Sequence, residues 1–247
     1  MTKVTNIEKS ELVLGDLDHH VPGTDFDRVI DRNIRRGYEQ GAAASRQVYM
    51  RFGKRLLDIT IVLCGTVFLL PVLVLIAFKI RLDGGPIFYT QTRIGRGGQE
   101  FRFWKFRTMC QDADARLKEL LKADPIARRE WDETQKLKHD PRITRFGNIL
   151  RKTSLDELPQ MWNVLLGDMS VVGPRPMMAS QRDLYPGTEY YLLRPGMTGF
   201  WQISERNDVS FASRARYDRD YWHDVSFSTD VKVIFDTVGV VYKASGH

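Results

Sequence analysis

The stretch Ile59–Phe78, with the sequence ITIVLCGTVFLLPVLVLIAF, is a run of twenty residues that carries no charged side chain. About 20 apolar residues suffice for a helix to cross the hydrocarbon core of a bilayer. Pro71 stands near the middle of the run, where a proline removes a helix hydrogen bond and kinks or breaks the helix. Basic residues flank the run on both sides: Arg51, Lys54 and Arg55 precede it, and Lys79, Arg81, Arg93 and Arg96 follow it.

These flanks indicate the topology of the run in a membrane, because basic flanks of a membrane segment tend to stay in the cytoplasm. A helix that breaks at Pro71 and leaves on the side where it entered places both flanks in the cytoplasm. The sequence therefore favours a re-entrant hairpin. A straight membrane span and a buried core helix are the alternatives.

The run divides the chain into three predicted parts. Residues 1–45 form a polar N-terminal extension, residues 46–82 the basic-flanked membrane hairpin, and residues 83–247 a cytoplasmic domain. The extension contains one set of apolar residues at helical spacing, which predicts either a tethered surface helix or a helix that binds a membrane or a partner. This set is Phe26, Val29, Ile30, Ile34 and Tyr38.

The cytoplasmic part begins with a strand pattern. Ile87–Tyr89 and Phe101–Trp104 are aromatic runs on either side of Gly95–Gly98, which predicts a β-hairpin. The glycine-rich turn is not a phosphate-binding loop, because no Gly-Lys-Ser/Thr follows it and no helix opens there.

Helical patterns follow the hairpin. Residues 112–139 are charged and helical in character, with an interruption at Pro125, and predict a solvated helical excursion. The last helix has an apolar face that either joins the core or rests on lipid. This face consists of Val231, Ile234, Phe235, Val238, Val241 and Tyr242. The predicted fold is α+β and mainly helical: a re-entrant membrane helix hairpin and a small cytoplasmic domain with a β-hairpin and amphipathic interfacial helices.

The composition narrows the class of partner. The 247 residues carry a formal net charge of +6, which favours an anionic partner such as nucleic acid, acidic lipid or a phosphorylated substrate. Cys64 lies in the apolar run, so a disulfide with Cys110 is not expected, as in a reducing compartment. The polar, acid-containing start has no features of a secretory signal peptide.

The stretch Arg151–Gln160, RKTSLDELPQ, carries the candidate chemistry. It predicts a helix that starts near Ser154 and ends at Gly167. In the simplest interpretation, Ser154 and Glu157 form an ordinary capping box. However, basic residues precede the helix N-terminus, which itself binds anions, so we expect Asp156 to be held ionised as a carboxylate nucleophile requires.

The neighbouring acid suggests a second role. Consecutive helical residues point about 100° apart, so Asp156 and Glu157 are not expected to share one task. One could attack while the other holds a hard cation such as Mg²⁺, which prefers carboxylate and phosphate oxygens. The five scattered histidines and the absence of an HExxH motif argue against a zinc site.

Several cations are candidates for binding phosphate. Arg175 stands between two prolines, Arg194 precedes Pro195-Gly196, and Lys105 and Arg107 lie just beyond the predicted hairpin. Each is an ordinary surface charge when taken singly. Several arginines in rigid Pro/Gly loops, together with Arg151, suggest a clamp for a diphosphate.

At this point the chain resembles the bacterial sugar transferase family, the polyprenyl-phosphate hexose-1-phosphate transferases of the monotopic kind. The resemblance covers the chain from about residue 50 to its end, with the motifs in order and at family-like spacing. The matching motifs are Lys54–Asp58, Gly84–Phe88, Lys105–Met109, Leu155–Gln160, Asn163–Leu165, Gly167–Ser170, Gly173–Pro176 and Arg194–Gly199.

The resemblance implies a reaction. Asp156 would attack the sugar-bearing phosphate of a UDP-sugar, release UMP and carry the phosphosugar, which a lipid phosphate, usually undecaprenyl phosphate, then accepts. It also implies that Mg²⁺ assists, that Glu157 is associated with the metal, and that Arg151 and Arg175 lie near the phosphates. Pro71 corresponds to the break of the family's re-entrant hairpin, although Leu70 replaces the serine that some members have before it.

The resemblance also sets expectations for donor and location. Lys136–Arg142 and Arg206–Ser210 are similar to transferases that begin exopolysaccharide units, so we expect UDP-galactose or UDP-glucose as the donor. The expected location is the cytoplasmic face of the bacterial inner (plasma) membrane. The oligomeric state is left open, with a homo-oligomer as one alternative.

Two other classes of function compete with this one. A non-catalytic membrane scaffold accounts for the charge and the apolar run but leaves Asp156 and Glu157 unexplained. A nucleic-acid binder accounts for the bases and aromatics around Trp104 but leaves Ile59–Phe78 without a purpose. We therefore expect membrane lipid, and no nucleic acid, as a partner.

Overall fold

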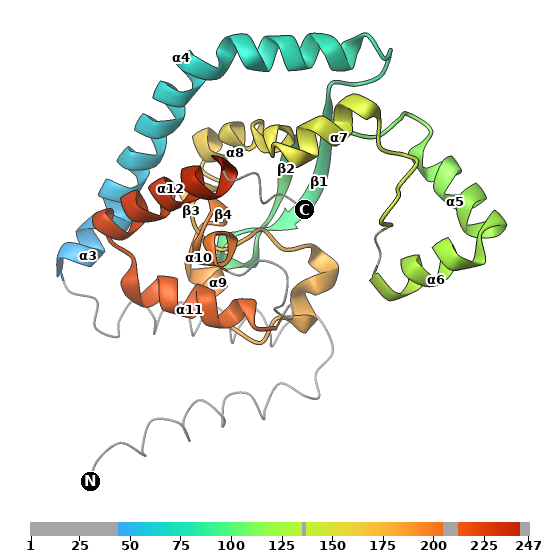
Figure 1. The fold of residues 1–247 in the computed structure, drawn as a ribbon. Coiled ribbons are helices and arrows are strands. Elements are labelled where there is room, and N and C mark those ends of the chain that lie inside the picture. Colours follow the sequence, from blue (N-terminus) through green and yellow to red (C-terminus); the bar gives the residue numbers. More distant parts are fainter. Residues whose placement is uncertain (1–43, 135–136, 205–211, 243–247) are drawn as a thin grey trace.

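The computed structural model describes residues 44–134, 137–204 and 212–242. The predicted helix around Phe26–Tyr38 and the Arg206–Ser210 motif lie outside the described residues. Within them the chain is mainly helical and has two small two-stranded sheets (Figure 1). In chain order the elements are α3 (Ala44–Val48), the π-helical turn η1 (Tyr49–Gly53), α4 (Lys54–Arg81), β1 (Phe88–Ile94), the 3₁₀ segment η2 (Arg96–Gly98), β2 (Glu100–Phe106), α5 (Ala113–Ala123), α6 (Pro125–Thr134), α7 (Arg145–Lys152), the 3₁₀ turn η3 (Leu155–Glu157), α8 (Gln160–Leu166), β3 (Ser170–Val172), the 3₁₀ segment η4 (Ala179–Leu184), α9 (Glu189–Leu192), β4 (Gly196–Thr198), α10 (Phe200–Ile203), α11 (Arg214–Asp224) and α12 (Phe227–Tyr242).

Helix α4 contains the whole apolar run. It continues through Pro71, so the predicted break of the helix at this proline is wrong, and the helix as a whole is bent (Figure 1). A proline removes one hydrogen bond of the ladder, which kinks a helix while the turns on either side persist. By length and composition, residues 46–81 form the one helix in the described part of the chain that is long and apolar enough to cross a membrane.

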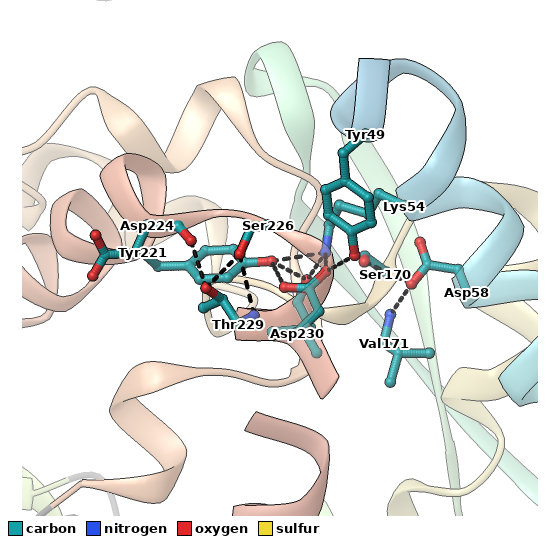
Figure 2. A network of polar contacts seen from close by, with 11 residues as sticks. Tyr49, Lys54, Asp58, Ser170, Val171, Tyr221, Asp224, Ser226, Thr229 and Asp230 are labelled. Carbon is teal, nitrogen blue, oxygen red and sulfur yellow. Dashed lines mark hydrogen bonds and ion pairs between the residues drawn. The ribbon is translucent and has the colours of Figure 1, made fainter. Parts of the chain in front are cut away.

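The N-terminal end of α4 is fixed to the rest of the protein by buried polar contacts (Figure 2). Lys54 Nζ lies 2.6 Å from Asp230 Oδ2 on α12, and it also donates to the Tyr221 hydroxyl at 2.7 Å. One turn later, Asp58 accepts hydrogen bonds from the Ser170 hydroxyl and from the Val171 amide of β3, both at 2.8 Å. Because these groups are buried, each needs the others as partners.

The C-terminal end of α4 packs against the same domain. Ile76 and Ile80 are buried with Phe106 of β2 and Leu150 of α7. Between the two ends one face of the helix still packs against the domain through Leu69, Val72 and Leu73, while the opposite face is exposed, with Phe68 82% exposed. A helix buried in the core is therefore excluded. Instead α4 arches over the domain (Figure 1), and several of its apolar side chains are exposed.

The predicted β-hairpin is confirmed. Strands β1 and β2 pair antiparallel, from Phe88 opposite Phe106 to Ile94 opposite Glu100. Gly97 has a φ of 68°, a left-handed conformation that suits glycine in the turn. A second, parallel pair joins β3 to β4, with Val172 opposite Thr198. Lys105 lies within β2, and not beyond the hairpin as the sequence predicted.

The predicted helical excursion is also confirmed, as α5 and α6, which project to one side of the molecule (Figure 1). Pro125 is the first residue of α6, a position that costs no helix hydrogen bond. On α12, Phe235 and Val238 of the predicted apolar face are exposed, whereas Val233 is buried. The side chains of Val241 and Tyr242 lie outside the described set.

Candidate active site

Asp156 and Glu157 lie in the short 3₁₀ turn η3, between α7 and α8. The prediction of a single helix beginning near Ser154 is wrong. Ser154 has a φ of 57° and makes no capping hydrogen bond with its side chain, so the capping box is also excluded. Thr153 ends α7, and the new helix begins only after Pro159. The predicted C-terminal cap is confirmed, since Gly167 closes α8 with a φ of 92°.

Lys105 brings the two acids together. It extends from β2, and its Nζ lies 2.6 Å from Glu157 Oε1 and 3.6 Å from Asp156 Oδ2. The sequence predicted acids that point apart and serve separate tasks, whereas both carboxylates meet the same lysine. Asp156 is only 7% exposed, so most of its surface faces protein.

Burial and charge act differently on the two carboxyl groups. Burial raises the pKa of Asp156 above its usual value, against the opposing effect of Lys105 and Arg151. For Glu157 burial also acts upward, but Lys105 and Arg175 outweigh it and hold the pKa below its usual value. The prediction of an aspartate kept ionised by a helix N-terminus therefore does not hold. Ionisation of Asp156 instead depends on its neighbouring cations.

Arg151 and Arg175, two of the predicted phosphate ligands, lie beside the acids. Arg151 donates through Nε to the Thr108 hydroxyl at 2.9 Å, and burial lowers its pKa while Asp156 raises it. Arg175 is exposed, and its guanidinium lies over the Trp201 ring, 5.1 Å from the ring centroid. Both arginines therefore interact electrostatically with η3, one with each acid.

Arg107 and Arg194 are not brought to this cluster. Arg107 Nη2 lies 2.8 Å from Asp83 Oδ2, beyond the C-terminal end of α4. Arg194 donates to the carbonyl oxygen of Gly167 at 2.9 Å, so it satisfies the end of α8. Neither arginine is among the groups that shift the pKa of Asp156 or Glu157.

The structure adds Arg93 to the site, a residue that the sequence treated only as a membrane flank. Burial lowers the pKa of Arg93, and the charge of nearby Arg175 lowers it further, while Glu157 acts in the opposite direction. Two arginines thus share the space beside Glu157. The sequence contained one usable signal for this: Arg93 lies in the same predicted hairpin as Lys105.

The acidic side chains of the site are candidate ligands for a metal ion. Among the described residues, no group of three or more His, Cys, Asp or Glu side chains is arranged to hold a metal ion. Asp156 and Glu157 are a pair of carboxylates, a number that suits Mg²⁺ when a substrate supplies phosphate oxygens as the remaining ligands. A carboxylate surrounded by cations is also suited to attack phosphorus, since the cations bind the phosphate charge.

Comparison with known proteins identifies relatives of the chain. The model of the family described as bacterial sugar transferase matches residues 49–244. The chain is 48% identical over 198 residues to the UDP-galactose-lipid carrier transferase of Erwinia amylovora, an overlap of 79% of this chain and 42% of that protein. It is 45% identical over 196 residues to the exopolysaccharide production protein ExoY of Sinorhizobium fredii, with 78% and 87% covered.

A third relative is the UDP-glucose:undecaprenyl-phosphate glucose-1-phosphate transferase of Escherichia coli, which is 38% identical over 208 residues. That overlap covers 79% of this chain and 42% of the relative. The chain therefore spans less than half the length of the Erwinia and Escherichia proteins, and most of the length of the Sinorhizobium protein.

Proposed function

The chain belongs to the bacterial sugar transferase family, and on this premise we propose that it transfers hexose 1-phosphate from a UDP-sugar to undecaprenyl phosphate. This transfer would begin the synthesis of an exopolysaccharide or another glycoconjugate. The observation that carries the proposal is the buried Asp156, held beside Glu157 and Lys105 with Arg151 at its side. A non-catalytic membrane scaffold or a nucleic-acid binder does not require this arrangement of acids and cations.

In the first step, a carboxylate oxygen of Asp156 attacks the phosphorus that carries the sugar. A bond forms between that oxygen and phosphorus, and the bond from phosphorus to the bridging oxygen of the diphosphate breaks. UMP leaves with the bridging oxygen and its electron pair. Lys105 and Arg151 stabilise the ionised form of Asp156 for this attack, because both lower its pKa against the effect of burial.

In the second step, a phosphate oxygen of the lipid attacks the same phosphorus. The bond from phosphorus to Asp156 breaks, and the carboxylate is regenerated. Arg175 and Arg93 lie on the Glu157 side of the site, where they would neutralise the phosphate oxygens of the donor. Positioning charge where phosphate oxygens bind is a large part of phosphoryl-transfer catalysis.

We propose that Glu157 is a ligand of Mg²⁺, with Asp156 as the neighbouring carboxylate. When bound, the metal ion supplies positive charge that shields the phosphate oxygens. The depressed pKa of Glu157 keeps this carboxylate ionised and able to serve as a ligand. Lys105, which contacts both acids, holds their charges together when no substrate is present.

For the donor we favour UDP-galactose over UDP-glucose. The relative with a galactose donor in its name is 48% identical to this chain, against 38% for the relative with a glucose donor. Release of UMP from a panel of UDP-sugars, by membranes that contain the protein, tests both activity and sugar. The expected result is release from UDP-galactose; release only from UDP-glucose would reassign the donor, and none from any UDP-sugar would reject the proposal.

We further propose that α4 enters and leaves the membrane on the cytoplasmic side. Lys54 and Asp58 at one end and Ile80 at the other all contact the same domain, which cannot lie on both sides of a bilayer. The basic residues at both ends suit the cytoplasmic side of a membrane. The apolar middle, which includes Phe68, would then lie in the lipid.

Cysteine labelling tests this topology. In a background that lacks Cys64 and Cys110, Arg51→Cys and Leu82→Cys are both expected to react from the cytoplasmic side only. Adding Pro71→Ala should straighten α4 and expose the first of these two positions on the outside in part of the molecules, because the helix regains its missing hydrogen bond. Labelling of the two positions from opposite sides without that change would reject the re-entrant arrangement.

Arg175→Ala and Arg151→Ala should each lower turnover roughly ten- to a hundredfold, because a charge-assisted phosphate contact contributes about 1.5–3 kcal/mol. UMP release with saturating Mg²⁺ is the measurement, with membrane content of each variant as the check on folding. Arg129→Ala, on the exposed excursion α6, is the matched control and should keep full turnover. Near-normal activity in both site variants would exclude them as phosphate ligands.

A further inference from the structure

A cavity of about 290 Å³ lies where α4 ends and α7 begins. Lys79, Leu82 and Asp83 line it from the α4 side, and Arg107, Thr144 and Phe146 line it from the opposite side. None of these residues contributes to the Asp156–Glu157 cluster. The cavity is large enough for a phosphate group with the first atoms of an attached chain.

Positive charge gathers around this cavity. The side chain of Arg107 is 8% exposed, and although Nη2 pairs with Asp83, the buried Nη1 has no hydrogen-bond partner among the described residues. Lys79 adds a second cation, and Asp83 is the one acid in the lining. The N-terminus of α7 adds a partial charge, because Thr144 caps this helix and the amides of a first helical turn have no acceptor within the helix.

The other part of the lining is apolar and continues into the exposed face of α4. Leu82 is 66% exposed at the cavity, and Phe78 is 62% exposed one turn earlier. Phe146 closes the opposite wall and packs in the same apolar cluster as Ile80. A ligand that suits this cavity therefore combines a phosphate with a long hydrocarbon chain.

The cavity is also connected to the reactive acid. Thr108 follows Arg107 directly in sequence, and its hydroxyl accepts a 2.9 Å hydrogen bond from Arg151. Arg151 in turn lies close enough to Asp156 to alter its pKa. Leu155, the residue before Asp156, packs against the apolar cluster that contains Ile80. Thr108 and Arg151 thus connect the lining of the cavity to the nucleophile.

We propose that this cavity is the binding site of the lipid phosphate acceptor, with Arg107, Lys79 and the start of α7 holding its phosphate and the exposed face of α4 holding its chain. This assignment rests on the proposed function, which supplies a lipid phosphate as second substrate. It gives Arg107 a role in acceptor binding, away from the donor diphosphate.

The same geometry accounts for the glycine pair before Pro86. A Cβ atom added to Gly85 would lie 1.4 Å from Arg107 Nη1, so the guanidinium occupies the space that any side chain at this position would fill. Gly84 has a φ of 81°, a conformation that suits glycine. Gly85→Ala is therefore expected to displace the Arg107 guanidinium without removing its charge.

The experiment is equilibrium binding of a radiolabelled polyprenyl phosphate to the full chain in nanodiscs of a zwitterionic lipid. Lys79→Gln and Gly85→Ala should each raise the Kd roughly tenfold, as expected for a weakened charge-assisted contact. Lys122→Gln, an exposed lysine on α5, is the matched control and should leave the Kd unchanged. In turnover assays the two cavity variants should raise the KM for the acceptor and leave the KM for the UDP-sugar as it is.

Unchanged binding in both cavity variants would overturn the assignment. So would equal displacement of the polyprenyl phosphate by phosphatidylglycerol, because that result describes a site for bilayer phospholipid. Lys79 is exposed and its substitution leaves the fold intact, so a folding defect in Gly85→Ala does not obscure the result. Failure of the enzyme to release UMP from any UDP-sugar would reject the proposed reaction, while the binding measurement would still decide the role of the cavity.

Discussion

Asp156→Asn is expected to abolish both the release of UMP from the donor and the covalent capture of the phosphosugar. The neutral amide is a poor nucleophile, and loss of a nucleophile lowers turnover by roughly a thousandfold or more. The unsubstituted protein, incubated with Mg²⁺ and donor but without lipid acceptor, should release one UMP per active site in a burst. It should also retain label from the β-phosphate.

Substitution of the adjacent acid, Glu157, should give a different result from Asp156→Asn. Glu157→Gln removes a carboxylate that the neighbouring cations keep ionised, so turnover should fall and require more Mg²⁺, while the residue that forms the covalent bond remains. Asp114→Asn, at an exposed acid in the first turn of α5, should behave as the unsubstituted protein. Continued turnover by Asp156→Asn, with no labelled protein formed in any sample, would eliminate Asp156 as the nucleophile.

Lys54→Met is expected to have the largest effect on stability. Lys54 and Asp230 are almost completely buried, with side chains 6% and 1% exposed, and Tyr221 donates to the same aspartate at 2.6 Å (Figure 2). Removing the cation leaves a buried carboxylate without its counter-charge, which costs about 3–5 kcal/mol. Thermal unfolding of the full chain in nanodiscs should show a Tm lower by roughly 10 °C.

Two further variants test whether loss of the Lys54–Asp230 ion pair is the cause of the lower stability. Lys54→Met combined with Asp230→Leu should recover part of the loss, because the buried carboxylate of Asp230 is removed together with its counter-charge. Arg128→Met breaks an exposed ion pair with Asp132 and should cost less than about 1 kcal/mol. If Lys54→Met costs no more than Arg128→Met, the buried pair does not hold α4 to α12.

Local features of the fold could be predicted from the sequence because local physics determines them. The charge-free run from Ile59 to Phe78 is long enough to predict a membrane helix, and Pro71 predicts a distortion within it. Glycines between two aromatic runs predict the hairpin, and Gly167 marks the end of α8. In each case residues within a few positions of one another specify the backbone conformation.

The start of the helix at Ser154 shows where local reasoning failed. A capping-box sequence is compatible with a helix, but Pro159 cannot donate the hydrogen bond that an uninterrupted helix needs at that point. The chain instead forms η3 and begins α8 afterwards. The acids consequently lie in a connecting turn, where burial and nearby cations, and not a helix N-terminus, set the pKa of Asp156.

The sequence by itself therefore determined the long apolar helix, the hairpin and the two candidate acids, together with the family motifs that single them out. Only the tertiary structure decided which cations meet them. Lys105 lies 52 positions before Glu157 and contacts it from β2, whereas Arg107, two residues later, contacts Asp83 instead. Lys54 pairs with Asp230, which lies 176 positions later in the sequence. Periodicity and capping describe neighbours along the chain, but the partner of a buried charge depends on which elements pack together, and packing is a property of the whole fold.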